Sequence, residues 1–305
     1  MKHTLIYGKV KNINRQGILM AGASYFIWGI MPLYWKLLKP IDSGVIIFYR
    51  IILVAAVSLF IVLKTEGKEA LKAAVRPEKA KLLFLLAGAF ITANWSLYVW
   101  AVNAGFVIQT SIGHYMEPLL IALAGVFIFR EKFTRSKFIA FLLAISGVMV
   151  IIIAHHEVPV LALTLGSTFA VYAAVKKYIH CSSMVSLFYE TIFFVPAAAA
   201  VVLWLEITGR GALAAATGLQ YLLLMTVGAV TVLVLWLFSE SETKTSLSNI
   251  GVIAYLSPTI SLLLGIFVFH ESFDRIQMLA FSIIWAGLFL YAAGSCRNSR
   301  QQSYK

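Results

Sequence analysis

The sequence is poor in charged residues for its length. Of its 305 residues, 12% are Asp, Glu, Lys or Arg and 61% are hydrophobic, and the mean hydropathy is +0.88. A soluble protein of this size needs many more polar side chains to cover its surface. The shortage of charge therefore excludes a soluble globular fold and predicts a chain whose solvent is a lipid bilayer.

The sequence also lacks the patterns that metal and nucleotide chemistry require. Its two cysteines, Cys181 and Cys296, fall in polar segments and indicate neither a disulfide framework nor a Cys-rich metal site. It has no Walker-type glycine-rich loop, so coupling to ATP is unsupported. We expect no cofactor, no metal and no enzymatic activity. Two short groups of candidate ligands occur, but neither supplies three or four converging ligands: His155, His156 and Glu157, and the i, i+3 pair His114 and Glu117.

Long apolar runs fill most of the chain. A transmembrane helix needs about 20 apolar residues, whereas a barrel strand needs about 10 alternating ones, so these runs predict an all-α polytopic membrane protein. The first run is too long for the core of a signal peptide, and we expect it to be retained as a span. The ten predicted spans cover residues 17–38, 43–63, 81–102, 107–129, 138–154, 158–175, 184–206, 219–238, 247–269 and 278–294.

The basic residues gather on one side of these spans. If the N-terminus is cytoplasmic, 20 of the 25 Lys and Arg residues fall in cytoplasmic segments. The outer segments then hold only Lys36, Lys39, Arg210 and Arg275. The positive-inside rule therefore predicts a plasma-membrane protein with both termini in the cytoplasm. The net charge of +12 reports this topology and requires no nucleic-acid partner.

An internal repeat appears at an offset of 140 residues, without a gap. Residues 115–147 and 255–287 are identical at 12 of 33 positions. The shared residues include a proline and a glutamate in each copy, and we expect the two glutamates, Glu131 and Glu271, to be structural mates. The same offset aligns pairs elsewhere in each half, so the repeated unit covers five spans: 36 with 176, 48–49 with 188–189, and 88–89 with 228–229.

Because five is odd, the second copy must cross the membrane in the opposite direction. The charges agree, since residues 130–137 carry four cations whereas residues 270–277 carry one cation and two acids. The fold class is therefore ten transmembrane helices in two inverted five-helix repeats (5+5). The predicted domains are a cytoplasmic N-tail (1–16), the first repeat (17–154), the second, inverted repeat (155–294) and a cytoplasmic C-tail (295–305).

Inverted repeats are a recurring design of secondary transporters. Two halves of opposite orientation can exchange inward-open and outward-open shapes around a site near the midplane of the bilayer. The predicted function is therefore transport of a small-molecule substrate, with protons as a possible coupling ion. Two alternatives stay open, namely a membrane-embedded enzyme and a channel-like or assembly protein that retains an old duplication.

Four segments carry a family resemblance: SYFIWGIMPLYWKLL (Ser24 to Leu38), NWSLYVWAVN (Asn94 to Asn103), Tyr115 to Glu131, and Tyr255 to Glu271. Together with the repeat, they make the chain similar to the drug/metabolite transporter superfamily, in its EamA fold and most closely the RarD subfamily. The resemblance implies an exporter or exchanger of small organic metabolites or drugs. It also implies a cavity lined by spans one to four and six to nine.

This chain departs from the subfamily pattern at two positions. Ala254 stands where the resemblance implies a polar amide before the tyrosine of the ninth span, and Glu117 stands where it implies an asparagine before Pro118. Both departures bear on the chemistry of the substrate.

Charged residues inside the predicted spans are few, and Arg50 and Glu190 stand out among them. A charge there costs about 2.5 to 3.5 kcal/mol on insertion scales, so each is a functional candidate. Arg50 and Glu190 are repeat mates, each roughly 10 Å in from opposite faces. We expect Arg50 to bind a carboxylate or other anion, and Glu190 to bind an amine or the coupling proton. The alternative is that Arg50 snorkels outward and Glu190 sits at a cytoplasmic helix start.

Polar residues extend the predicted cavity. Asn94 and Tyr98 share one helix face, and Asn94 is either a site group or a hydrogen-bonding link between helices. Tyr115 and Tyr255 are repeat mates that stand just before prolines. The expected helix breaks, at which a backbone carbonyl becomes free, lie at Pro118 and Pro258.

Aromatic residues divide into two groups. Trp28 and Tyr172 lie deep in their spans and are candidates to stack on an aromatic or cationic substrate. Tyr34, Trp35 and Trp100 lie near span ends, where the aromatic belt at the membrane interface accounts for them.

Overall fold

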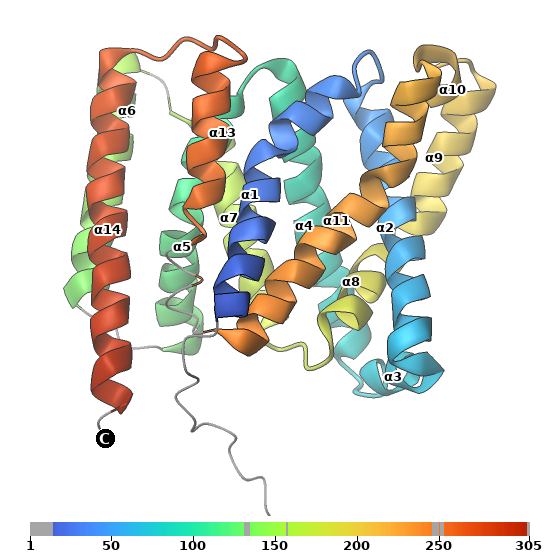
Figure 1. Cartoon of the computed structure of the whole chain (residues 1–305), viewed down its shortest axis with the longest axis horizontal. Helices are drawn as coiled ribbons and strands as arrows, with labels where there is room; N and C mark the ends of the chain where they lie inside the picture. Colours follow the sequence, from blue (N-terminus) through green and yellow to red (C-terminus); the bar gives the residue numbers. More distant parts are fainter. Residues whose placement is uncertain (1–14, 131–134, 157, 246–249, 251–252, 304–305) are drawn as a thin grey trace, which may run out of the picture.

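The computed structural model describes residues 15–130, 135–156, 158–245, 250 and 253–303, so Glu131, Glu157 and most of the N-tail lie outside the described residues. Every regular element in this part of the chain is an α-helix, and most of the long helices stand side by side in one direction (Figure 1). The helices are α1 (Arg15–Leu37), α2 (Ser43–Thr65), α3 (Gly67–Ala74), α4 (Ala80–Ala104), α5 (Val107–Phe129), α6 (Arg135–His155), α7 (Val160–Lys176), α8 (Ser183–Ile192), α9 (Val195–Ile207), α10 (Ala212–Ala215), α11 (Gly218–Lys244), α13 (Leu256–Phe267) and α14 (Arg275–Ser303).

The predicted spans fall on helices or pairs of helices wherever the structure describes them; the start of the ninth span, at 247–249 and 251–252, lies outside the described residues. Within the described residues, five helices are long and apolar enough to cross a membrane: α1, α2, α4, α5 and α11. The pair α8 and α9 makes a sixth if it is one span, and α6, α7 and α13 contain shorter apolar helices. The all-α membrane fold is confirmed, while the number of ten crossings stays a prediction.

The seventh predicted span is not one straight helix. α8 and α9 meet at a bend of 55°, and α9 begins at Val195 with Pro196 as its second residue. Proline suits the first turn of a helix because its missing N–H would have no partner there. The expectation of one helix over 184–206 is therefore wrong, and Pro196 is the sequence signal for the break.

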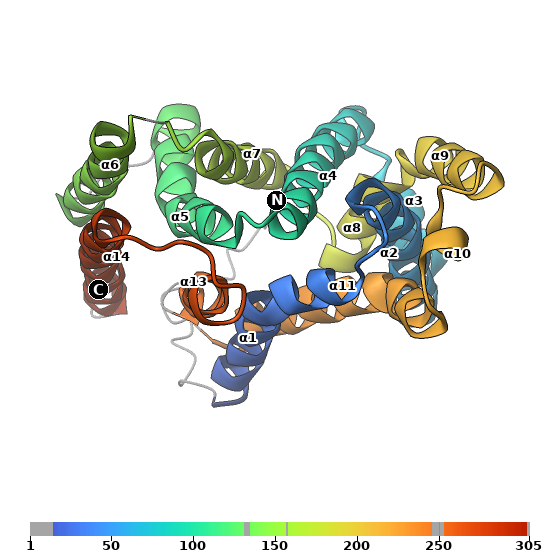
Figure 2. The same ribbon diagram turned by 90° about the horizontal axis from the view of Figure 1, so that it is seen from above.

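The helix contacts follow the 140-residue repeat. α1 packs against α11 and α13, and its counterpart α7 packs against α4 and α5. The pairs α6–α14, α5–α13 and α2–α8 each join a helix to its own counterpart. Figure 2 shows α6 and α14 together at one end of the bundle and α2, α8 and α9 at the other. The backbone conformation also matches just after α5 and α13, where the repeat mates Arg130 and His270 both have a φ of 54°.

Two repeat-related glycines bring helices into close contact. Gly88 of α4 lies against the backbone of Glu190 on α8, and Gly228 of α11 lies against the backbone of Leu53 on α2. A Cβ atom at either glycine would overlap the facing carbonyl. Small residues allow membrane helices to approach in this way. The two contacts hold α8 and α2, which carry Glu190 and Arg50, firmly inside the bundle.

Candidate functional site

Arg50 is a buried cation with unused hydrogen-bond donors. Its side chain on α2 is 7% exposed, so it does not snorkel to the surface. The guanidinium carbon lies 4.3 Å from the centre of the Trp95 ring and 5.1 Å from that of Trp35. Its Nε and Nη1 atoms are buried and have no hydrogen-bond partner. Two aromatic faces thus hold the charge, and the donors remain available for an anionic group.

Trp35 belongs to this site and not to an aromatic belt. The indole is 1% exposed, although Trp35 stands near the end of α1. Side chains on a helix point back toward its N-terminus, which directs this indole into the bundle. The belt prediction is therefore wrong for Trp35. Tyr34 is half-buried, and its hydroxyl donates to the carbonyl of Leu223 at 2.6 Å. Trp100 is 48% exposed, as an interfacial residue would be.

Glu190 is fully buried and bound by three donors. Lys176 Nζ lies 2.6 Å from Oε1, Ser186 Oγ donates to the same oxygen at 2.5 Å, and Tyr172 donates to Oε2 at 3.2 Å. The two carboxylate oxygens therefore have partners on α7 and α8. Arg50 and Glu190 share no hydrogen bond or ion pair. Lys176, which the charge pattern placed among the cytoplasmic cations, is the partner that sequence reasoning missed.

Asn94 and Trp28 contact neighbouring helices. Asn94 Nδ2 donates to the carbonyl of Leu165 at 2.8 Å and to Thr168 Oγ1 at 3.0 Å, which links α4 to α7. This geometry favours the structural alternative for Asn94. Trp28 of α1 packs against two other rings of the protein in tilted arrangements, with its ring centre 5.4 Å from that of Tyr25 and 6.0 Å from that of Phe238 on α11.

Tyr115 and Tyr255 meet at the contact between α5 and α13. Their rings are stacked with centres 6.4 Å apart, and the Tyr115 hydroxyl lies 2.6 Å from Thr259 Oγ1. Tyr115 is completely buried, so it supports the joint between the two halves. The structure shows no break at Pro118, because α5 runs through it as one helix. Pro258 follows a turn at residues 254–255 and lies in the first turn of α13.

His114 and Glu117 form a half-buried pair on α5. His114 Nε2 lies 3.6 Å from Glu117 Oε1, and the side chains are 23% and 15% exposed. Glu117 Oε1 is buried without a hydrogen-bond partner. The His114 ring meets Tyr98 edge-on, with centres 5.2 Å apart. Trp95, three residues before Tyr98 on α4, lies against Arg50. Neighbouring residues of α4 therefore contact Arg50 and the His114–Glu117 pair.

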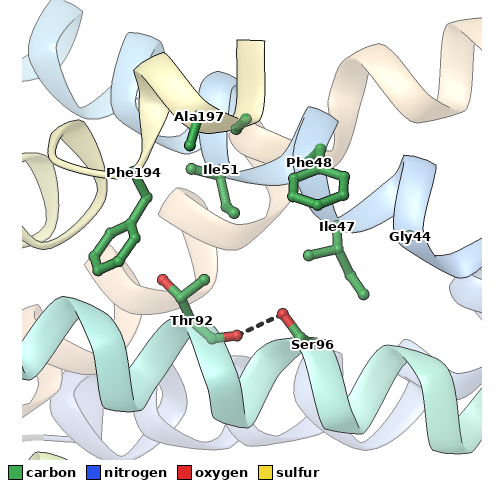
Figure 3. A pocket seen from close by; sticks show the side chains of 9 residues that line it. Gly44, Ile47, Phe48, Ile51, Thr92, Ser96, Phe194 and Ala197 are labelled. Atoms are coloured by element: carbon green, nitrogen blue, oxygen red, sulfur yellow. Dashed lines mark hydrogen bonds between the residues drawn. The ribbon is translucent and has the colours of Figure 1, made fainter. Parts of the chain in front are cut away.

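An apolar cavity of about 280 Å³ lies between α2, α4 and the start of α9. Figure 3 shows Phe48 and Ile51 of α2 facing Thr92 and Ser96 of α4, with Phe194 closing one side. Ser96 Oγ donates to the carbonyl of Thr92 at 2.7 Å, whereas Thr92 Oγ1 is buried without a hydrogen-bond partner. None of the predicted cavity residues lines this space, whose lining residues are Gly44, Ile47, Phe48, Ile51, Thr92, Ser96, Phe194, Ala197 and Ala198.

Comparison with known proteins gives the same family throughout. The model of the EamA-like transporter family matches twice, at residues 15–153 and 158–293. The chain is 34% identical to the uncharacterized transporter YojE of Bacillus subtilis over 91% of this chain and 93% of that one. It is 32% identical to protein RarD of Streptomyces exfoliatus, over 96% and 93%, and 29% identical to protein RarD of Escherichia coli, over 95% and 98%.

A solved structure has the same fold. It is described only as the crystal structure of a protein, and it matches with a TM-score of 0.61 and 16% identity over 93% of this chain and 99% of that one. The double family match and the RarD relatives agree with the apolar helices and with the resemblance noted in the sequence. This chain belongs to the EamA-like transporter family, as a RarD-like member of the drug/metabolite transporter superfamily.

Proposed function

We propose that the chain is a secondary transporter that exports or exchanges small organic solutes bearing a carboxylate or another anionic group. The observation that carries this proposal is the buried guanidinium of Arg50, whose Nε and Nη1 atoms have no partner. A buried charge inside a membrane span is costly, and its usual use is to bind a substrate, ion or proton. A carboxylate that enters from water would satisfy the free donors.

The surroundings of Arg50 favour a solute with an aromatic or apolar part. Trp35 and Trp95 present ring faces next to the guanidinium. A carboxylate on Arg50 would place the rest of a small solute beside these rings, where stacking adds roughly 0.5–1.5 kcal/mol. Tyr98 supplies a further ring that lies against His114, and His114 lies 3.6 Å from Glu117. The Glu117 carboxyl group would suit the ammonium group of a zwitterion such as phenylalanine.

Alternating access follows from the relation between the two halves. The paired contacts of α1 with α11 and α13, and of α7 with α4 and α5, support two inverted repeats that rock against each other. Arg50 is the eighth residue of α2, about 10 Å from the start of that helix. A solute bound at this depth becomes accessible from either face when the repeats exchange shapes.

The direct test is flux in proteoliposomes of the purified full chain. Labelled phenylalanine, an amphipathic amine and chloramphenicol are supplied separately, and counterflow is measured at rising concentration. We expect saturable counterflow of phenylalanine, and loss of it in Arg50→Ala. Arg210→Ala is the matched control, because Arg210 is exposed and lies in a predicted outer loop. Flux that does not saturate, or that is unchanged in Arg50→Ala, would overturn the proposal.

A further inference from the structure

We propose that Glu117, paired with His114, is the proton-binding site that couples transport to the proton gradient, and that the proton and the cationic group of the solute compete for it. This inference rests on the proposed transport function and adds to it the coupling ion and the direction of coupling. Glu190, the acid that the sequence favours for this role, has different surroundings.

Glu117 lies at the depth where a proton must be exchanged in alternating access. It is the eleventh residue of the 23-residue helix α5, so a rise of 1.5 Å per residue places it about 15 Å from the start of the helix. The hydrocarbon core is about 30 Å thick, so this position is near its middle. A lone carboxylate there is expensive to keep charged, and a proton makes it neutral.

The immediate contacts leave this carboxyl group free to change its protonation state. Oε1 is buried without a hydrogen-bond partner, and His114 Nε2 at 3.6 Å lies beyond the distance of a true hydrogen bond. Glu190 contrasts with it, because Lys176, Ser186 and Tyr172 all donate to its carboxylate. Oε1 of Glu117 is therefore open to a proton or to a cationic group of the solute, whereas both carboxylate oxygens of Glu190 already accept from donors of the protein.

Few other titratable groups face the pair. The helices packed against α5 are α7, α13, α6 and α4, and α4 contributes Tyr98, whose ring touches His114. The α7 residues from Val160 to Val171, the α6 residues from Phe138 to Ala154, and the whole of α13 contain no titratable side chain. Tyr255, just before α13, stacks on Tyr115. Arg50 lies against Trp95, three residues before Tyr98 on α4.

The charges define how the proton and the solute exclude one another. With one shared proton, Glu117 and His114 are together neutral. When that proton passes from the pair to cavity water, the pair carries one negative charge. An ammonium group of the solute can then replace the proton while its carboxylate binds Arg50. The proton and the solute therefore occupy the site alternately, which makes the chain a proton antiporter.

The first test needs no solute. Purified protein in liposomes is titrated with acid while infrared difference spectra record the carbonyl stretch of protonated carboxylic acids. We expect wild type to show a band from a buried protonated carboxyl group that is absent in Glu117→Gln and retained in Glu190→Gln. A band that persists in Glu117→Gln, or that disappears only in Glu190→Gln, would overturn the assignment.

The second test separates coupling from transport. Labelled phenylalanine is followed in proteoliposomes by counterflow at equal pH and by accumulation driven by a pH gradient. We expect Glu117→Gln to weaken counterflow at equal pH, because the ammonium group loses its carboxylate, and to abolish accumulation driven by the pH gradient. Glu117→Asp, which keeps a carboxylate, should retain both. Accumulation that persists in Glu117→Gln overturns the coupling role, whereas absence of counterflow in wild type counts against the proposed function itself.

Discussion

Glu271 caps the first turn of α5 from the other half of the molecule, with one carboxylate oxygen accepting the N–H of Val107 at 2.8 Å. Its second oxygen accepts the N–H of Ile108, also at 2.8 Å. Both N–H groups belong to a helix start and have no partner inside the helix. The acid therefore joins the two repeats at the face that we predict to be outer, in keeping with the structural role expected for it.

Removing this cap should lower stability. We expect Glu271→Ala to reduce the free energy of unfolding by about 1–2 kcal/mol, because two helix-start N–H groups lose a charged acceptor. Thermal unfolding in detergent measures the change. Glu69→Ala is the control, since Glu69 forms an exposed pair with Lys72 and such pairs contribute about 0–1 kcal/mol. Equal effects of the two variants would contradict the capping role.

The ion pair of Lys176 and Glu190 should behave as a coupled unit. Removal of one partner from a buried pair leaves an uncompensated charge, so we expect Lys176→Met to destabilise the protein by about 3–5 kcal/mol. The double variant Lys176→Met with Glu190→Gln should recover much of this loss, because no buried charge is then left alone. A double-mutant cycle on thermal unfolding measures the coupling, and strictly additive effects would show that the pair is not coupled.

Trp95 should hold Arg50 in place for the solute. A cation–π contact contributes about 0.5–2 kcal/mol, so Trp95→Ala should weaken solute binding by roughly 2- to 30-fold. Trp95→Phe keeps a ring face and should lose less. The half-saturating concentration for phenylalanine counterflow measures both variants. An effect as large in Trp95→Phe as in Trp95→Ala would indicate that the indole acts by some other contact.

A methyl group at Gly88 should disturb the packing of α4 on α8. Its Cβ would overlap the backbone of Glu190, so we expect Gly88→Ala to lower the unfolding temperature and to impair transport. Gly22→Ala on α1 is the matched control, because nothing lies within 4 Å of a Cβ at Gly22. There the alanine should be neutral or stabilising, since it favours helix more than glycine does.

Alkylation of Cys181 tests both the pKa of this thiol and the side of the membrane on which its loop lies. Burial raises the pKa of this thiol to about 11, so the neutral form dominates at pH 7 and the reactive thiolate is scarce. In a Cys296→Ser background, alkylation by a charged maleimide should be slow at pH 7 and should accelerate as the pH rises toward that pKa. Labelling of inside-out vesicles but not of intact cells would agree with the predicted cytoplasmic loop. The reverse pattern would refute the predicted orientation.

The sequence determined the features that depend on local composition and spacing. Long apolar runs specify membrane helices because a bilayer requires every backbone polar group to be bonded within its own segment. The 140-residue repeat and the uneven distribution of Lys and Arg can likewise be recognised from the sequence, without knowledge of any tertiary contact. They were enough to predict the all-α membrane fold and, together with the four segments that carry the resemblance, the family; the role of Arg50 stays a prediction.

The tertiary structure decided which side chains are partners. The sequence could not show that Arg50 lies between Trp35 and Trp95 while Glu190 binds Lys176, because each of these contacts joins different helices. It also could not distinguish Glu117, which lacks a partner for its buried oxygen, from Glu190. Hydropathy assigns a residue to the membrane, but only the packing of one helix on another selects the donor or ring that faces a buried charge.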